Sequence, residues 1–99
     1  MMSLSHAREF LDDAAQRFCH MSFDNLLPYA NRSTGEPHVF EYTVEGEIVY
    51  INLTASLLGR LRKRVGVELV LSRVGEQWSE VPSAYFERFR SGKLVYYPP

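Results

Sequence analysis

The sequence predicts an α+β fold in which a small antiparallel sheet, made of a β-hairpin and two or three further strands, has helices packed on one face. Three patterns support this prediction: helical periodicity near the N-terminus, a hairpin signal in the middle of the chain, and short segments of helix and strand character after it. The predicted order of elements is α-β-β-α-β-(β)-α-β. A chain of 99 residues has the usual size of one domain, so a single α+β domain is expected over residues 1–99.

Residues 3–21 are predicted to form the first helix, because apolar residues recur there at spacings of three and four. Ser3 or Ser5 can cap this helix, and neither Gly nor Pro interrupts it. The apolar stripe consists of Leu4, Ala7, Leu11, Ala14, Phe18 and Met21.

Residues 22–37 are predicted to form a connector, because they are rich in Asn, Pro, Ser and other residues that favour turns. Phe23, Leu26 and Leu27 are expected to hold this connector to the core as a single helical turn. The stretch 31–37 is expected to be the most mobile part of the chain.

The clearest local signal is a β-hairpin formed by residues 39–44 and 47–53 and joined by the two-residue turn Glu45-Gly46. This turn predicts that Tyr42 lies opposite Val49. The side of the hairpin that carries these two residues is predicted to face the core, because a register shift of one residue would bury a glutamate and expose a phenylalanine.

Beyond the hairpin, the periodicity predicts a second helix that Asn52 or Thr54 caps and that runs to Val65, with Gly66 as its stop. The segments predicted after it are a strand over 67–74, a short strand over 77–81, a helix over 83–90 with Tyr85, Phe86 and Phe89 on its apolar side, and a last strand over 93–97.

The composition is typical of a globular protein of the reducing cytoplasm. The 45% hydrophobic and 23% charged fractions are ordinary for a folded domain. Cys19 is the one cysteine, so no intramolecular disulfide can form. The N-terminal residues include acids and lack the apolar run of a signal peptide. No stretch approaches the roughly 20 apolar residues that span a bilayer. A cytoplasmic location without membrane contact is therefore expected.

Positive charge is concentrated in the second half of the chain, since residues 1–50 have a charge balance of −5 and residues 51–99 a balance of +4. A guanidinium group can donate two parallel hydrogen bonds to the oxygens of one phosphate. The basic residues on the second and third predicted helices are therefore a candidate anion or nucleic-acid patch. The alternative is that they merely favour a helix C-terminus, and a pI of 6.3 is low for a nucleic-acid binder. The patch consists of Arg60, Arg62, Lys63, Arg64, Arg88 and Arg90.

The sequence contains no motif for catalysis or for holding a metal or cofactor. His6, His20 and His38 lack the paired spacing of a metal site. Cys19 adjoins the apolar stripe of the first helix, where burial keeps the pKa of a thiol high. Nucleotide-binding and nucleophile-elbow motifs do not occur. We therefore expect no cofactor and no enzyme activity.

Aromatic residues make up 13% of the chain, and several have no obvious place in the core. Because Tyr and Trp are favoured in binding interfaces, Tyr50, Trp78, Tyr96 and Tyr97 form a candidate interface; the alternative is that they line the rim of a small core. The last predicted strand is either internal to the sheet or pairs with a second subunit across a two-fold axis.

These patterns favour a small cytoplasmic protein-binding or regulatory domain that acts as a homodimer. A nucleic-acid or phosphate binder that uses the basic patch is the first alternative. The second is a small-molecule binder or small enzyme with a pocket between helices and sheet, lined by His38, Tyr42 or Trp78.

Overall fold

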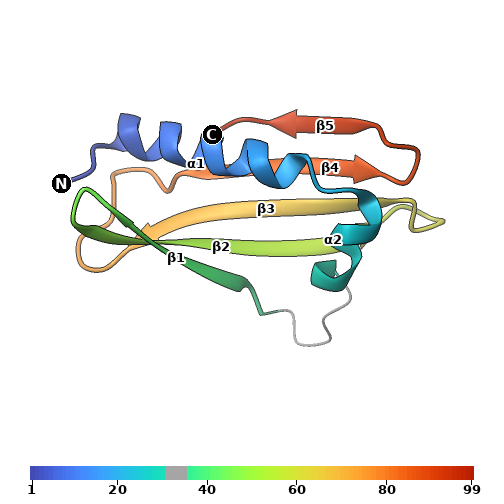
Figure 1. The fold of residues 1–99 in the computed structure, drawn as a ribbon, viewed down its shortest axis with the longest axis horizontal. Helices are drawn as coiled ribbons and strands as arrows, with labels where there is room; N and C mark the ends of the chain where they lie inside the picture. The colour runs from blue at the N-terminus through green and yellow to red at the C-terminus, as the bar shows by residue number, and fades with distance from the viewer. Residues whose placement is uncertain (31–35) are drawn as a thin grey trace.

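The computed structural model describes residues 1–30 and 36–99, and in them two helices precede a five-stranded antiparallel sheet (Figure 1). The strand order in the sheet is β1-β2-β3-β4-β5, so each strand pairs with the next one along the chain. The predicted α+β class with an antiparallel sheet is confirmed. The elements are α1 (Leu4–Cys19), α2 (Phe23–Ala30), β1 (His38–Val44), β2 (Glu47–Leu58), β3 (Arg64–Arg73), β4 (Ser83–Phe89) and β5 (Leu94–Tyr97).

The first helix forms as predicted, because its apolar stripe has a sheet to pack against and its N-terminus is capped. The Ser3 side chain accepts a hydrogen bond from the His6 N–H. α1 packs mainly on β3 and β4 and also contacts β1 through the Phe10–Tyr42 and Phe18–Phe40 ring pairs, while α2 packs on β2 and β3. The predicted connector contains α2, whose Phe23 and Leu26 are buried. The stretch expected to be most mobile falls largely on residues 31–35, which lie outside the described residues.

One hydrophobic core joins the helices to a single face of the sheet. Side chains alternate along a strand, so alternate residues of β2 and β3 are buried while those between them are more exposed. We call the second, more exposed side of the sheet the open face; it carries Tyr50 and Asn52 from β2 and Tyr85 from β4. The fully buried strand residues are Val49, Ile51, Leu53, Val65, Val67, Leu69, Leu71 and Phe86.

The hairpin prediction is confirmed in its turn and in its register. Tyr42 pairs with Val49 and Phe40 pairs with Ile51. Glu45 and Gly46 both have positive φ, at 53° and 76°, which is the backbone geometry of the two-residue turn that suits the twist of the flanking strands.

The second predicted helix is wrong, because β2 continues without a break to Leu58. The polar residues expected to cap a helix instead occupy the open face, and Ala55 and Leu57 continue the apolar alternation on the core side. Gly59, with a φ of 87°, begins the turn that leads into β3. Gly66, expected to stop the helix, lies inside β3 opposite Glu87.

The third predicted helix is also wrong, because residues 83–89 form β4. This strand pairs with β3 on one side and β5 on the other, which satisfies its backbone on both sides. The short strand predicted over 77–81 does not form, and that segment belongs to the connection between β3 and β4. The last predicted strand is present as β5, at the edge of the sheet.

The turns divide the molecule into two ends (Figure 1). The β1–β2 turn and the β3–β4 connection lie at the same end as the N-terminus, while the β2–β3 and β4–β5 turns lie at the other end. In the part of the chain that the structure describes, no helix has the length and apolar character required to cross a membrane.

Candidate anion-binding site at the basic end of the sheet

The β2–β3 turn and the β4–β5 turn bring basic residues from two parts of the sequence together. The backbone N–H of Arg90 donates to the carbonyl oxygen of Lys63 at 2.7 Å, which places the two turns side by side. Arg64 pairs with Phe89 at the adjoining strand ends. We call this region the basic end; it comprises Arg60, Arg62, Lys63, Arg64, Arg88, Arg90 and Lys93.

All six residues of the predicted basic patch therefore lie at this end, but on turns and strands, because the two predicted helices do not exist. Their side chains also do not share one face. The Arg64 side chain lies on the open face of the sheet. Arg88 is two residues from the buried Phe86, so its side chain lies on the core side of β4. The positive charge thus extends around the end of the sheet.

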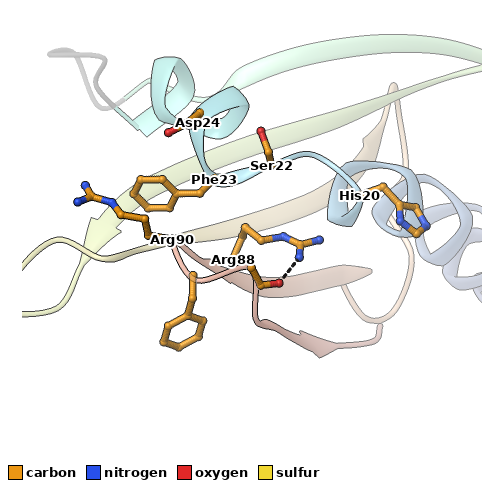
Figure 2. A pocket seen from close by; sticks show the side chains of 8 residues that line it. His20, Ser22, Phe23, Asp24, Arg88 and Arg90 are labelled. Atoms are coloured by element: carbon orange, nitrogen blue, oxygen red, sulfur yellow. Dashed lines mark hydrogen bonds between the residues drawn. The ribbon is translucent and has the colours of Figure 1, made fainter.

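A surface pocket of about 330 Å³ opens at the basic end, where the α1–α2 junction meets the β4–β5 turn (Figure 2). Its wall combines cationic, aromatic and polar groups with one carboxylate, that of Asp24. The lining residues are His20, Ser22, Phe23, Asp24, Arg88, Phe89, Arg90 and Gly92.

Arg88 holds the two sides of this pocket together. Its guanidinium donates to the backbone carbonyl of Gly92 at 2.7 Å and to the carbonyl of Cys19 at the end of α1. Both acceptors are neutral, and the buried Nε has no hydrogen-bond partner among the described residues. Among the described residues no carboxylate lies within ion-pair distance of Arg88, although the Asp24 side chain lines the same pocket.

Two of the other cations make cation–π contacts with aromatic rings. The Arg90 guanidinium lies 5.1 Å from the centre of the Phe23 ring, and the Lys93 ammonium lies 5.4 Å from that of Phe89. Among the described residues, the only ion pair at this end joins Arg64 to Glu87 at 3.3 Å. A ligand with negative charge would thus meet cations whose charges are mostly unpaired.

Cys19 beside the pocket is not suited to nucleophilic chemistry. Burial raises the pKa of the Cys19 thiol to about 11, and Arg88 only partly counteracts this effect. A thiol with this pKa stays protonated at neutral pH and is a weak nucleophile.

The aromatic residues proposed as an interface do not come together. Trp78 is buried, with its Nε1–H donating to the Met2 carbonyl at 2.9 Å. Tyr96 lies on the core side, where its hydroxyl bonds Asp12 at 2.5 Å. Tyr50 and Tyr97 lie on the open face, and Tyr97 is 55% exposed.

The residues named for a ligand pocket are also dispersed. Tyr42 lines an apolar surface groove of about 380 Å³ together with Phe18 and Met21 of the α1 region. The His38 ring lies 4.6 Å from the ring of Tyr29, and Trp78 lies near the N-terminus.

Sequence reasoning missed Phe23 and Phe89 as the rings beside the cations. The cation cluster at 60–64 was visible in the sequence, but its contact with Arg90 depends on the pairing of β3 with β4, for which the segment had to be recognised as a strand.

The fold defines a small α+β protein whose five-stranded antiparallel meander carries a cationic, ring-lined end. No family of proteins, no curated protein and no solved structure matches this chain.

Proposed function

We propose that this protein is a binding protein without catalytic activity that takes up single-stranded nucleic acid at its basic end. The observation that supports this proposal is the convergence of seven cations on one end of the sheet, where Glu87 is the only ion-pair partner among the described residues. The chain as a whole has a net charge of −1, so this concentration is local.

A ligand with a series of phosphates fits this arrangement better than one with a single phosphate. The cations extend from Arg64 on the open face to Arg88 on the core side, beyond the limits of one pocket. Arg side chains bind phosphate oxygens in pairs, and a nucleic-acid backbone offers such oxygens at regular intervals.

The rings at this end favour a single strand over a duplex. Phe23 and Phe89 line the pocket next to Arg88 and Arg90, and unpaired bases stack on such rings. Most cations lie on turns and strand ends, and the basic end includes no helix residue that could enter a major groove.

The direct test is fluorescence anisotropy of a labelled single-stranded oligonucleotide. We expect binding at low ionic strength that weakens steeply between about 50 and about 200 mM salt, and weaker binding of a duplex of the same length. If the wild-type protein does not bind the oligonucleotide at low ionic strength, the proposal is wrong.

Two variants with the same net charge locate the site. Arg60→Ala removes one cation from the basic end, and Arg8→Ala removes one from the start of α1, beside Glu80 at the opposite end of the molecule. The first should weaken binding and lower the slope of log affinity against log salt by about 1 for each phosphate that the variant no longer neutralises. The second should bind like the wild type. Equal weakening in both variants would mean that binding depends on net charge and not on this site.

A further inference from the structure

β5 is an edge strand whose outer side carries unused backbone groups. The Leu71 N–H donates to the Pro82 carbonyl and the Arg90 N–H to the Lys63 carbonyl, so the even-numbered residues of the β4 segment bond β3. The Phe89 N–H donates to the Lys93 carbonyl, so the odd-numbered residues bond β5. It follows that Leu94 and Tyr96 direct their N–H and C=O groups away from β4.

These outward groups are arranged so that β5 is complementary to itself. If two copies of β5 pair antiparallel about a two-fold axis at Val95, Leu94 of each copy lies opposite Tyr96 of the other. Each such pair can exchange two backbone hydrogen bonds, since all the groups involved point outward. A shift of this register by two residues in either direction loses one hydrogen-bonded pair. In one direction Leu94 would lie opposite Leu94 of the other copy; in the other direction it would lie opposite Pro98, which has no N–H.

The side chains suit the same register. On the open face Val95 would meet Val95, and on the core side Leu94 would meet Tyr96. No residue of β5 carries a charge, and Leu94 and Tyr97 are exposed at 38% and 55%. Cross-strand apolar pairs of this kind stabilise antiparallel pairing.

The other edge strand, β1, is less suited to pairing with its own copy. Its outward backbone groups belong to Val39, Glu41 and Thr43, since Val44 and Glu47 close the two-residue turn. A two-fold axis at the middle of this edge would place two Glu41 carboxylates opposite each other. A charge in this position is a common means of preventing edge association.

The two-fold axis at Val95 lies near the basic end of each copy. Val95 is two residues from Lys93 and five from Arg90, so the two copies bring their basic ends toward each other across the axis. Like charges at these ends oppose association, so the backbone pairing and the apolar contacts of β5 are what stabilise it.

We infer that a second copy of this chain pairs along β5, which extends the five-stranded sheet into one continuous ten-stranded sheet across a two-fold axis. The four-residue strand limits the contact to a small area, so the dimer is weak and depends on concentration. This inference does not depend on the proposed nucleic-acid site.

The test is sedimentation equilibrium of the whole chain over a range of concentrations, with two proline variants. Leu94→Pro removes an N–H that points outward and leaves the bonds between β4 and β5 in place. Val39→Pro makes the same kind of change on the edge of β1 and is the matched control. We expect the wild type and Val39→Pro to approach twice 11.4 kDa with rising concentration, and Leu94→Pro to stay monomeric.

A second pair of variants covers the case in which a proline prevents folding. Val95→Lys places like charges opposite each other across the proposed axis, and Val39→Lys adds the same charge to the open face at β1. Only Val95→Lys should abolish the dimer. A wild type that is monomeric at every concentration, or a dimer that only the Val39 variants disrupt, would overturn the inference.

Discussion

Gly66 lies within β3, where the Tyr85 side chain from β4 covers it on the open face. A Cβ atom at this position would lie 2.5 Å from the Tyr85 hydroxyl oxygen and 2.6 Å from Leu58 Cδ1. The hydroxyl donates to Glu87 at 2.8 Å, which fixes the ring over the glycine. Burial and then this hydrogen bond raise the pKa of Tyr85 to about 12. The ring thus fills the space of the missing side chain.

We predict that Gly66→Ala lowers the free energy of unfolding by about 1 kcal/mol, because Tyr85 must move and give up its bond to Glu87. Denaturant unfolding followed by the emission of the single Trp78 measures this change. In a Tyr85→Ala background the same substitution should cost clearly less, because only the end of the Leu58 side chain then has to move. An equal cost in both backgrounds would contradict the role given to the ring.

One polar cluster holds together four parts of the chain: the residues before α1, the start of β2, the end of β3 and the β3–β4 connection. The Glu47 carboxylate accepts from the Met2 N–H at 2.9 Å and from Arg73 at 3.1 Å. Arg73 also donates to the Met2 carbonyl at 3.1 Å and lies 4.1 Å from the Trp78 ring centre. These contacts join residues that are far apart in the sequence.

This cluster predicts a loss of stability in acid. The Met2 N–H, followed by Arg73, lowers the pKa of Glu47 in the folded protein below its ordinary value of 4.5, although burial opposes the shift. The ionised Glu47 carboxylate therefore stabilises the folded protein fully above pH 4.5, and this contribution is lost as the pH falls through the lower pKa of Glu47 in the folded state. Unfolding measured against pH should show a smaller acid-dependent loss for Glu47→Gln than for the wild type. Parallel profiles would show that Glu47 does not contribute.

Elements with strong local signals were predictable from the sequence, and those that depend on neighbouring strands were not. α1 has four turns of consistent periodicity and a cap, and the first hairpin has a turn of defined geometry. Residues 83–89 are compatible with two periodicities, because Tyr85, Phe86 and Phe89 fit a helix stripe while Ala84 and Phe86 fit a strand. Pairing with β3 and β5 decides between them, and a local pattern does not contain that information.

The candidate site was predictable to the same extent. The cations at 60–64 are adjacent in the sequence, so their clustering required no knowledge of the fold. Their position beside Arg88 and Arg90 follows from the register of β3 and β4. This register could not be predicted while residues 83–90 were assigned to a helix.

Charge is divided unevenly over the whole molecule. Seven cations gather at one end, while the net charge of the chain is −1, so the rest of the molecule carries the excess of acids. In the dimer that we infer, the axis at Val95 brings the two basic ends toward each other, and the repulsion between them is screened by salt.

The dimer should accordingly associate more strongly as ionic strength rises. Sedimentation of the wild type at low and high salt, at one protein concentration, measures the shift. Weaker association at high salt would contradict the approach of the two basic ends across this axis.

The meander arrangement has a consequence for synthesis on the ribosome. α1 is made first, yet most of its contacts with the sheet lie in β3 and β4, and its Asp12 bonds Tyr96 near the end of the chain. The first hairpin can close as soon as it emerges and can contact Phe10 and Phe18 of α1, whereas the rest of the apolar stripe stays uncovered until β3 and β4 follow. A nascent chain halted before β4 would therefore expose that stripe and be a natural target for chaperones.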